Sequence, residues 1–407
     1  MRFKIALLAG ALTLAGCTAG MSGSPEAASE PPAESVTMVT PPQRDPSELQ
    51  VLFWNDEQRA ERFRSMEAWF AGFEVPPASE PRIFPKGEQL TKDETTKIRS
   101  FMESTNAVGV MVLQDGKKRY EAYRLGFTPE QRWTSFSVAK SFTSTLLGAA
   151  VKDGFVASMQ DPVTKYIPDL AGSAYDGVTV EQLATMTSGV AWNEDYTDPN
   201  SDVAQMNRFV VDYGPEAIVR QMRELKREAP PGEKWLYKTG ETNLIGVLVE
   251  NAVGLPLAKY AQSKIVDPAG FEGGMFWMVD LRGGNIGGCC LSLRLGDYAR
   301  MGQFVLEGGH DAVPEGWFAK AAGPVVAFDE GETLSHFAPA TNGFGYGYQW
   351  WTYPGGKFGA QGIFGQAITV VPEKRLVAVV LSSWPTASSS QTRLAWFKLV
   401  DEIAAAN

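Results

Sequence analysis

Residues 137–150 read SVAKSFTSTLLGAA, and this stretch decides both the expected fold and the expected chemistry. In a helix formed by this stretch, Ala, Leu and Gly would lie on several faces, which indicates that the helix is buried on most sides. We expect the helix to begin near Ser137 and to end near Gly154. Residues three apart share one face of a helix, so Lys140 should lie one turn above Ser137. Apolar residues mark one face of the helix: Val138, Phe142, Leu146 and Ala149.

This spacing brings an amine within reach of a hydroxyl. A helix start offers unpaired backbone N–H groups and the positive end of the helix dipole, which suit a nucleophile that carries charge through a tetrahedral intermediate. A lysine with its ordinary pKa near 10.4 would be protonated and useless as a base, but burial lowers that pKa. The alternative is a serine cap followed by a surface lysine, because roughly one Ser-x-x-Lys is expected by chance in such a chain. We predict that Ser137 is a nucleophile and that Lys140 is its proton partner.

A second motif follows about a hundred residues later. Residues 230–239 read PPGEKWLYKT and lead into an apolar helix predicted at Leu244–Glu250. The phenol of Tyr237 could relay a proton, and the hydroxyl of Thr239 could hold a substrate. The alternative for Tyr237 is a packing residue where a loop meets a helix.

Other chemistries have few candidate residues. The chain holds only two histidines, and it contains no Gly-x-Ser-x-Gly, so neither a Ser-His-Asp triad nor a zinc site is expected. We predict no metal and no organic cofactor. A formal net charge of −10 argues against nucleic acid as a partner. Of the three cysteines, Cys289 and Cys290 are predicted to be buried small hydrophobic residues, and no disulfide framework is expected.

The pattern of elements predicts an α+β fold. Strands are expected near both ends of the chain, and the stretch between them reads mainly as helices with long loops, so we predict an antiparallel sheet flanked by helices with an inserted helical subdomain at about residues 155–285. The hydrolase domain would span 106–407, with an N-terminal arm at 51–105 packed on it. The expected strands are Val108–Leu113, Tyr120–Tyr123, Gly345–Tyr353, Gly365–Val371 and Leu376–Ser382, followed by a helix at Thr392–Ala404.

The first residues are typical of an exported lipoprotein. Residues 1–16 have a short basic start and an apolar stretch that is too short to span a bilayer, as in a signal peptide. Residues 14–17 read LAGC and resemble the bacterial lipobox, in which cleavage leaves Cys17 as the lipidated N-terminus. The alternative is an ordinary secretory signal. Residues 17–50 are rich in Ala, Ser, Glu and Pro and predict a disordered tether.

Acyl chains on Cys17 would anchor the protein to a membrane rather than let it span one. We therefore expect a location in the cell envelope. Thr18 after the acylated cysteine fits the sorting of bacterial lipoproteins to the outer membrane, with the domain facing the periplasm.

Taken together, the motifs resemble a known family. Ser137-x-x-Lys140, Tyr237-x-Thr239 and a late Gly-rich strand occur in the order seen in serine β-lactamases and penicillin-binding proteins, and their spacing is similar to the class C branch. Within that branch the chain resembles the 6-aminohexanoate-dimer hydrolase group. The segments that carry this second resemblance are NEDYTDP at 193–199, GIFGQ at 362–366 and LSSWP at 381–385.

The resemblance implies a role for each matching residue. Ser137 would be acylated, Lys140 would act as general base, and Tyr237 would protonate the leaving group. The oxyanion hole would consist of the backbone N–H groups of Ser137 and Gln361. Tyr196 would close over the substrate, and Asn207 would lie where the group places the residue that decides between amides and esters. The expected substrate contacts are Tyr196, Asn207, Thr239 and Gly362.

One motif departs from the β-lactamase pattern. Residues 357–362 read KFGAQG where β-lactamases carry Lys-Thr-Gly. An ungapped count places Lys357 at the first motif position, whereas the hydrolase group favours Gln361 at the oxyanion hole, and we prefer the second register. Without Lys-Thr-Gly, tight binding of a β-lactam carboxylate is not expected.

The leading hypothesis is therefore a serine hydrolase that cleaves ester or amide bonds of small substrates. The alternatives are a cell-wall DD-peptidase or β-lactamase, and a non-catalytic envelope lipoprotein that only binds. The pocket should be partly apolar. Its predicted aromatic walls are Trp133, Tyr196, Tyr346 and Trp350.

Overall fold

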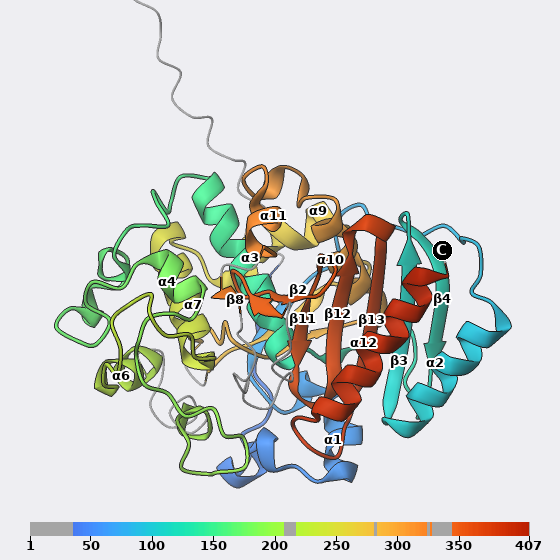
Figure 1. Cartoon of the computed structure of the whole chain (residues 1–407). Coiled ribbons are helices and arrows are strands. Elements are labelled where there is room, and N and C mark those ends of the chain that lie inside the picture. Colours follow the sequence, from blue (N-terminus) through green and yellow to red (C-terminus); the bar gives the residue numbers. More distant parts are fainter. Residues whose placement is uncertain (1–35, 207–216, 281–282, 324–325, 328–343, 407) are drawn as a thin grey trace, which may run out of the picture. The chain divides into compact units, whose positions relative to one another are not determined.

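Two antiparallel sheets and the helices around them make up the structure, a computed structural model that describes residues 36–206, 217–280, 283–323, 326–327 and 344–406 (Figure 1). The larger sheet has eight strands in the order β4-β3-β13-β12-β11-β10-β9-β8. The predicted α+β class is confirmed. The strands of this sheet are β3 (Ala107–Gln114), β4 (Lys117–Tyr123), β8 (Val326–Ala327), β9 (Gly345–Tyr346), β10 (Trp351–Tyr353), β11 (Lys357–Gly362), β12 (Gln366–Val371) and β13 (Leu376–Ser382).

The hairpin of β3 and β4 forms where the sequence predicts it. Asp115 and Gly116 connect the two strands with positive φ angles of 50° and 68°, as the two central residues of a type I′ turn require. Gly116 adopts this conformation without steric cost, and aspartate tolerates it better than most side chains.

The centre of the large sheet is covered on both faces. Consecutive residues of a strand point to opposite faces. On one face, Gly302 of α10 lies so close to β12 that an added Cβ would be 2.9 Å from the side chain of Ile368. On the other, Trp396 of α12 donates its indole N–H to Thr369 at 3.0 Å. Every residue of β12 and β13 is therefore buried. The helices that cover them are α10 (Leu295–Leu306) on one face and α12 (Ser390–Ala405), with α2 (Lys92–Ser104) beside it, on the other (Figure 1).

The smaller sheet corrects two of the predicted boundaries. It has the order β1-β2-β6-β7-β5. Part of the predicted tether at 17–50 is thus ordered, because the backbone of residues 37–39 pairs with β2; residues 17–35 lie outside the described residues. The N-terminal arm supplies β2 to this sheet rather than only packing on it. The strands are β1 (Thr37–Val39), β2 (Gly72–Val75), β5 (Trp133–Thr134), β6 (Met275–Met278) and β7 (Leu291–Leu293).

The region between the sheet strands is mainly helical, as predicted, but it ends earlier than residue 285 because β6 already belongs to the smaller sheet. The predicted Ser137 helix is present as a 3₁₀ turn, Phe136–Val138, followed by α3, and α3 packs against α7. The helices of this part are α3 (Ala139–Lys152), α4 (Val180–Ala184), α6 (Ala217–Glu224), α7 (Thr239–Val253), α8 (Leu257–Ala261) and α9 (Asp267–Ala269); α1 (Asp56–Arg62) and α11 (Trp317–Ala321) lie elsewhere in the chain.

The strand predicted at 345–353 is instead a tight hairpin of β9 and β10. Gln349, between the two strands, has a positive φ of 61° and reverses the chain. The carbonyls of Tyr348 and Gln349 accept hydrogen bonds from Ser144 (2.6 Å) and Ser141 (2.8 Å) of α3. The polar side chains of α3 thus stabilise a turn that alternation of apolar residues could not reveal.

Among the described residues, no single helix is long and apolar enough to cross a membrane. The helix α7 and the helical stretch Leu257–Ala269 are long and apolar enough only when they are counted together, and the chain bends by 77° between them.

Candidate active site

Ser137 lies in the turn that leads from β5 into α3. Phe136, just before it, has a positive φ of 44°, an uncommon conformation for an aromatic residue. The ring of Phe136 packs against Phe63 and Phe364, with centroids 4.9 and 5.3 Å apart, and this packing holds the turn. The side chain of Ser137 lines a cavity although the residue is only 8% exposed.

Lys140 reaches Ser137 in the way that the helical spacing predicts. Its Nζ donates to Ser137 Oγ at 3.0 Å and to the carbonyl of Gly288 at 2.8 Å. The residue is 1% exposed. Burial lowers the pKa of this amine to about 8, and the negative charge of Glu194 opposes part of that shift. A hydroxyl and a partly neutral amine are therefore in contact, and both residues are buried.

The carbonyl that holds Lys140 is itself fixed by neighbouring helices. Asn243 Oδ1 of α7 accepts the N–H of Gly288 at 2.7 Å, and Thr143 Oγ1 of α3 donates to the carbonyl of Gly287 at 2.6 Å. The backbone approaches closely here, because a Cβ on Gly288 would lie 2.9 Å from the carbonyl of Thr239. Nothing in the sequence analysis pointed to this loop, since its role depends on contacts across the fold.

Tyr237 completes the group around Ser137. Its side chain is hydrogen-bonded to that of Ser137. Its ring stacks on Trp351 with centroids 5.5 Å apart and meets the edge of Tyr346 at 6.0 Å. Burial raises the pKa of Tyr237 well above 10, so the phenol keeps its proton at neutral pH. The structure thus brings Ser137, Lys140 and Tyr237 together.

A buried carboxylate that the sequence analysis missed connects the substrate-binding candidates. Glu194 accepts hydrogen bonds from the Tyr196 hydroxyl at 2.7 Å, from the Thr239 N–H at 3.0 Å, and from the Thr239 hydroxyl and the Trp192 indole. The order Trp-x-Glu-x-Tyr is a signal for it, because alternate residues of an extended segment point the same way. Glu194 therefore fixes Tyr196 and the first residue of α7 at once.

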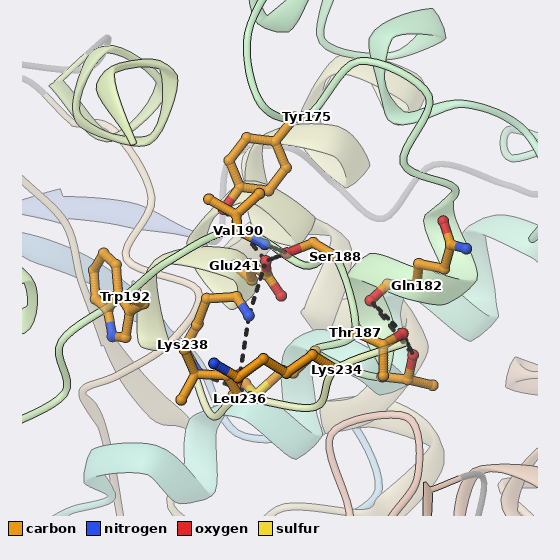
Figure 2. Close-up of polar contacts among 12 residues, drawn as sticks. Tyr175, Gln182, Thr187, Ser188, Val190, Trp192, Lys234, Leu236, Lys238 and Glu241 are labelled. Carbon is orange, nitrogen blue, oxygen red and sulfur yellow. Dashed lines mark hydrogen bonds and ion pairs between the residues drawn. The ribbon is translucent and has the colours of Figure 1, made fainter. Parts of the chain in front are cut away.

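The loop that carries Tyr237 rests on a second buried cluster (Figure 2). Lys238 Nζ donates to the carbonyl of Leu236 at 3.1 Å and lies 3.6 Å from Glu241, and neither charged side chain has any exposed surface. Ser188 and Tyr175 also donate to Glu241. Burial lowers the pKa of Lys238 and raises the pKa of Glu241, while their opposite charges act against both shifts. Through these contacts, Lys238 holds Leu236, just before Tyr237, and Glu241, just after it.

The cavity beside Ser137 has a volume of about 630 Å³. Tyr196 and Thr239 line it, as predicted, together with apolar residues such as Met206 and Ile363. The predicted walls Trp133, Tyr346 and Trp350 are wrong: they are not among the described residues that line the cavity, and all three are buried in the core.

Cys289 and Cys290 also line this cavity, and they form a disulfide between neighbouring residues. The prediction that they are two separate small hydrophobic residues without a disulfide is therefore wrong. Cys290 is buried, as expected, but Cys289 is only partly so. Consecutive cysteines gave no sign of pairing, because disulfides usually join residues far apart in the chain.

The structure resolves the register of the third motif. The Gly362 end of β11 lies against the Ser137 turn, since a Cβ on Gly362 would be 2.5 Å from the carbonyl of Ser135. Arg393 of α12 holds this end by donating to the Gly362 carbonyl at 2.9 Å. Lys357 lies at the other end of the strand, ion-paired with Asp401. The end of β11 that carries Gln361 and Gly362 is thus the end near the Ser137 turn, and Lys357 is at the other end.

Several assignments remain predictions. Gln361 is buried in β11 and its side chain amide donates to Tyr353 at 2.7 Å, but its role in an oxyanion hole is not tested by this contact. Gly362 adjoins the cavity-lining Ile363 without being among the described lining residues. Asn207 lies outside the described residues, as does Cys17. Within the part of the chain that the structure describes, no group of His, Cys, Asp or Glu side chains is arranged to bind a metal ion.

The chain is similar in sequence to known proteins. The family model described as Beta-lactamase matches residues 95–277. The 6-aminohexanoate-dimer hydrolase of Paenarthrobacter ureafaciens is 32% identical over 298 residues, which cover 70% of this chain and 74% of that protein.

Solved structures show the same fold. A candidate 6-aminohexanoate-dimer hydrolase from Bacillus anthracis has a TM-score of 0.76 at 21% identity, over 90% of this chain and 98% of that one. EstCE1, a hydrolase with promiscuous acyltransferase activity, has a TM-score of 0.61 at 14% identity, over 76% of this chain and 98% of its own. The structural likenesses show the fold, and the sequence relative shows the family. The chain therefore belongs to the beta-lactamase family of serine hydrolases.

Proposed function

We propose that this chain hydrolyses ester or amide bonds of small substrates through an acyl-enzyme on Ser137. One observation carries the proposal: a buried amine, with its pKa lowered to about 8, lies 3.0 Å from the Ser137 hydroxyl. With that pKa, about a tenth of the amine is neutral at pH 7 and able to accept a proton. A lysine on the protein surface would be almost fully protonated at the same pH.

Acylation follows from these contacts. Ser137 Oγ attacks the carbonyl carbon of the substrate while its proton passes to Lys140 Nζ, and the carbonyl oxygen becomes an oxyanion. The intermediate collapses as the bond to the leaving oxygen or nitrogen breaks. Tyr237, whose phenol is protonated at neutral pH, donates a proton to the leaving group and recovers one from Lys140. The leaving group departs as a neutral alcohol or amine, and the acyl group remains on Ser137.

Deacylation uses the same residues in reverse order. A water molecule takes the place of the leaving group and attacks the acyl carbon, with its proton passing to the Lys140 and Tyr237 pair. The bond between Ser137 Oγ and the acyl group breaks, the serine regains its proton, and the carboxylic acid leaves. The N–H groups of Ser137 and Gln361 are proposed to bind the oxyanion in both steps.

The cavity supports a substrate with an apolar body. Its volume of about 630 Å³ suits a small molecule rather than a folded protein. The relative named as a 6-aminohexanoate-dimer hydrolase indicates that linear amides belong among the substrates to be tested. Tyr196 lines the cavity and is held by Glu194, which supports the proposal that it contacts the substrate near the scissile bond.

β-Lactam hydrolysis is the weaker candidate. The lysine of the third motif region, Lys357, is paired with Asp401 at the far end of β11 and does not line the cavity. The carboxylate of a penicillin would therefore lack that partner. Labelling with fluorescent penicillin tests this point, and a stable adduct on Ser137 would favour a penicillin-binding role over the proposed one.

The experiment that tests the nucleophile is Ser137→Ala with p-nitrophenyl acetate as substrate. We expect hydrolysis to fall to the background rate, and labelling by a fluorophosphonate probe to disappear. Ser141→Ala is the matched control, because Ser141 lies one turn further along α3 and bonds the carbonyl of Gln349 away from the cavity. Undiminished hydrolysis by the Ser137 variant would refute the assignment, and an unreactive wild-type protein would favour a non-catalytic binding role.

We also propose that Cys17 carries acyl chains that hold the protein at the cell envelope. The support is the sequence pattern at residues 14–17 alone. Mass spectrometry of the N-terminal peptide after expression in a bacterium tests it, with Cys17→Ala as the variant expected to lose the lipid mass.

A further inference from the structure

The last residues of the predicted tether, with the two that follow it, form part of the cavity that contains Ser137. We call residues 40–52 the N-terminal strap. Most of the strap lines this cavity, including Pro41, Leu49, Val51 and Leu52. The same cavity is lined by Ser137, Tyr196 and Thr239, so the strap faces the place where a substrate would lie.

The strap is held in place at both ends. Before it, β1 pairs in register with β2 of the smaller sheet. Within it, the guanidinium of Arg44 lies 3.8 Å from the ring centroid of Trp69 and donates to the carbonyl of Ala68 at 3.1 Å. Further on, the indole of Trp54 donates to the carbonyl of Glu48 at 2.8 Å. A segment fixed at these points can shape a binding site.

The surface that the strap presents is mainly apolar. Among the described residues that line the cavity, only Arg44 and Asp280 carry charge. The guanidinium of Arg44 contacts the Trp69 ring and donates to the carbonyl of Ala68, and Asp280 accepts the N–H of Gly284 at 2.8 Å. The strap contributes branched aliphatic side chains, and Met206 and Val203 contribute further apolar groups. This lining suits a flexible hydrocarbon chain better than a charged group.

We propose that the N-terminal strap is a specificity-determining wall of the substrate site, and that its aliphatic residues set the length of apolar chain that the enzyme accepts. The inference rests on the proposed acyl-enzyme function. It identifies the preferred substrates as esters or amides whose acyl or leaving group is a medium-length apolar chain. It also means that a protein shortened to begin near Pro46 would lack part of its substrate site.

A pair of substitutions in the full chain tests the strap. Leu49 lines the cavity, whereas its neighbour Gln50 does not. Leu49→Trp should shorten the accepted chain, and Leu49→Ala should lengthen it. Each methylene that loses its apolar contact is expected to reduce kcat/KM about fourfold. Across p-nitrophenyl esters from acetate to decanoate, Leu49→Trp should thus lower the octanoate-to-acetate ratio of kcat/KM by about tenfold or more.

Gln50→Trp is the matched control and should leave the chain-length profile as in the wild type. Thermal unfolding and the rate of labelling by a small fluorophosphonate report whether each variant is folded with a reactive Ser137. The inference is overturned if folded Leu49 variants change kcat/KM by the same factor for every ester. It is also overturned if Gln50→Trp changes the chain-length profile as much as Leu49→Trp does. A wild-type protein that hydrolyses none of the esters and resists the fluorophosphonate would instead overturn the proposed function itself.

Discussion

The two sides of the active site are built in different ways. Ser137 and Lys140 stand three residues apart, and one turn of helix brings their side chains to 3.0 Å. The other side consists of Tyr196 in a loop and Thr239 at the start of α7, which are brought together by the buried carboxylate of Glu194. The first arrangement needs only a helix in a dry environment. The second needs a buried charge whose hydrogen bonds are all supplied by the fold.

This difference predicts different responses to substitution. Removing a member of the helical pair should abolish the chemistry while leaving the fold intact, because the helix forms without that contact. We call the side with Tyr196, Thr239 and Glu194 the loop-built side. Removing a buried polar group there should shift the side chains that it holds or lower the stability of the protein, because such groups replace the regular hydrogen bonds that loops lack. Three substitutions separate these outcomes.

The largest effect is expected from Lys140→Met, which keeps most of the volume of the side chain and removes the amine. Loss of a general base typically lowers rates by about 10²–10⁴-fold. We expect a fall of this size in kcat for p-nitrophenyl acetate, with little change in thermal unfolding, because a buried amine is replaced by an apolar group. A variant that unfolds far below the wild-type temperature would show instead that the helical pair is structural.

The helical side is also the side that could be predicted from the sequence. The spacing of Ser137 and Lys140 fixes their relation within one element, and the hairpin at Asp115 and Gly116 follows from residues that favour its turn. The strands predicted at 365–371 and 376–382 correspond to β12 and β13 almost to the residue. In each case, neighbours in the sequence supply the information that the structure uses.

The loop-built side could be predicted only in part. Tyr196 was found because it matches a family pattern. Asn243 and Gly288 act through partners far away in the chain. Glu194 joins its near neighbours Trp192 and Tyr196 to the distant Thr239. The turn at Gln349 depends on hydroxyl groups of α3. The strap residues looked like the end of a disordered tether, because their role depends on a cavity formed by other segments.

A second prediction concerns the buried pair beneath Tyr237. Lys238→Met would leave the carboxylate of Glu241 buried without its cation, and breaking a buried ion pair in this way costs about 3–5 kcal/mol. We expect a loss of this order in the free energy of unfolding, measured with urea. Lys234→Met is the control, since Lys234 is more exposed and its ion pair with Glu228 lies at the surface. Equal stability of the two variants would mean that the buried pair does not hold the loop.

The smallest of the three effects, and the most specific, is expected from Glu194→Gln. The amide keeps the size of the side chain but cannot accept every hydrogen bond that the carboxylate accepts, so Tyr196 and Thr239 should be held less firmly. We expect kcat/KM for p-nitrophenyl acetate to fall by about tenfold, as for the loss of a charged hydrogen bond. Glu233→Gln, on the exposed surface before Tyr237, is the matched control.

The same substitution should change the pH dependence, because the negative charge of Glu194 raises the pKa of Lys140. In the wild type, kcat/KM should rise about tenfold per pH unit below the pKa of Lys140, which is about 8, and level off above it as the amine becomes neutral. Removing the charge lowers the pKa of Lys140 further, so the rising limb should move to lower pH in Glu194→Gln and stay in place in Glu233→Gln. A limb that does not move would show that Glu194 is electrostatically independent of Lys140 and acts only by positioning, and a limb that moves to higher pH would contradict the expected sign of the charge effect.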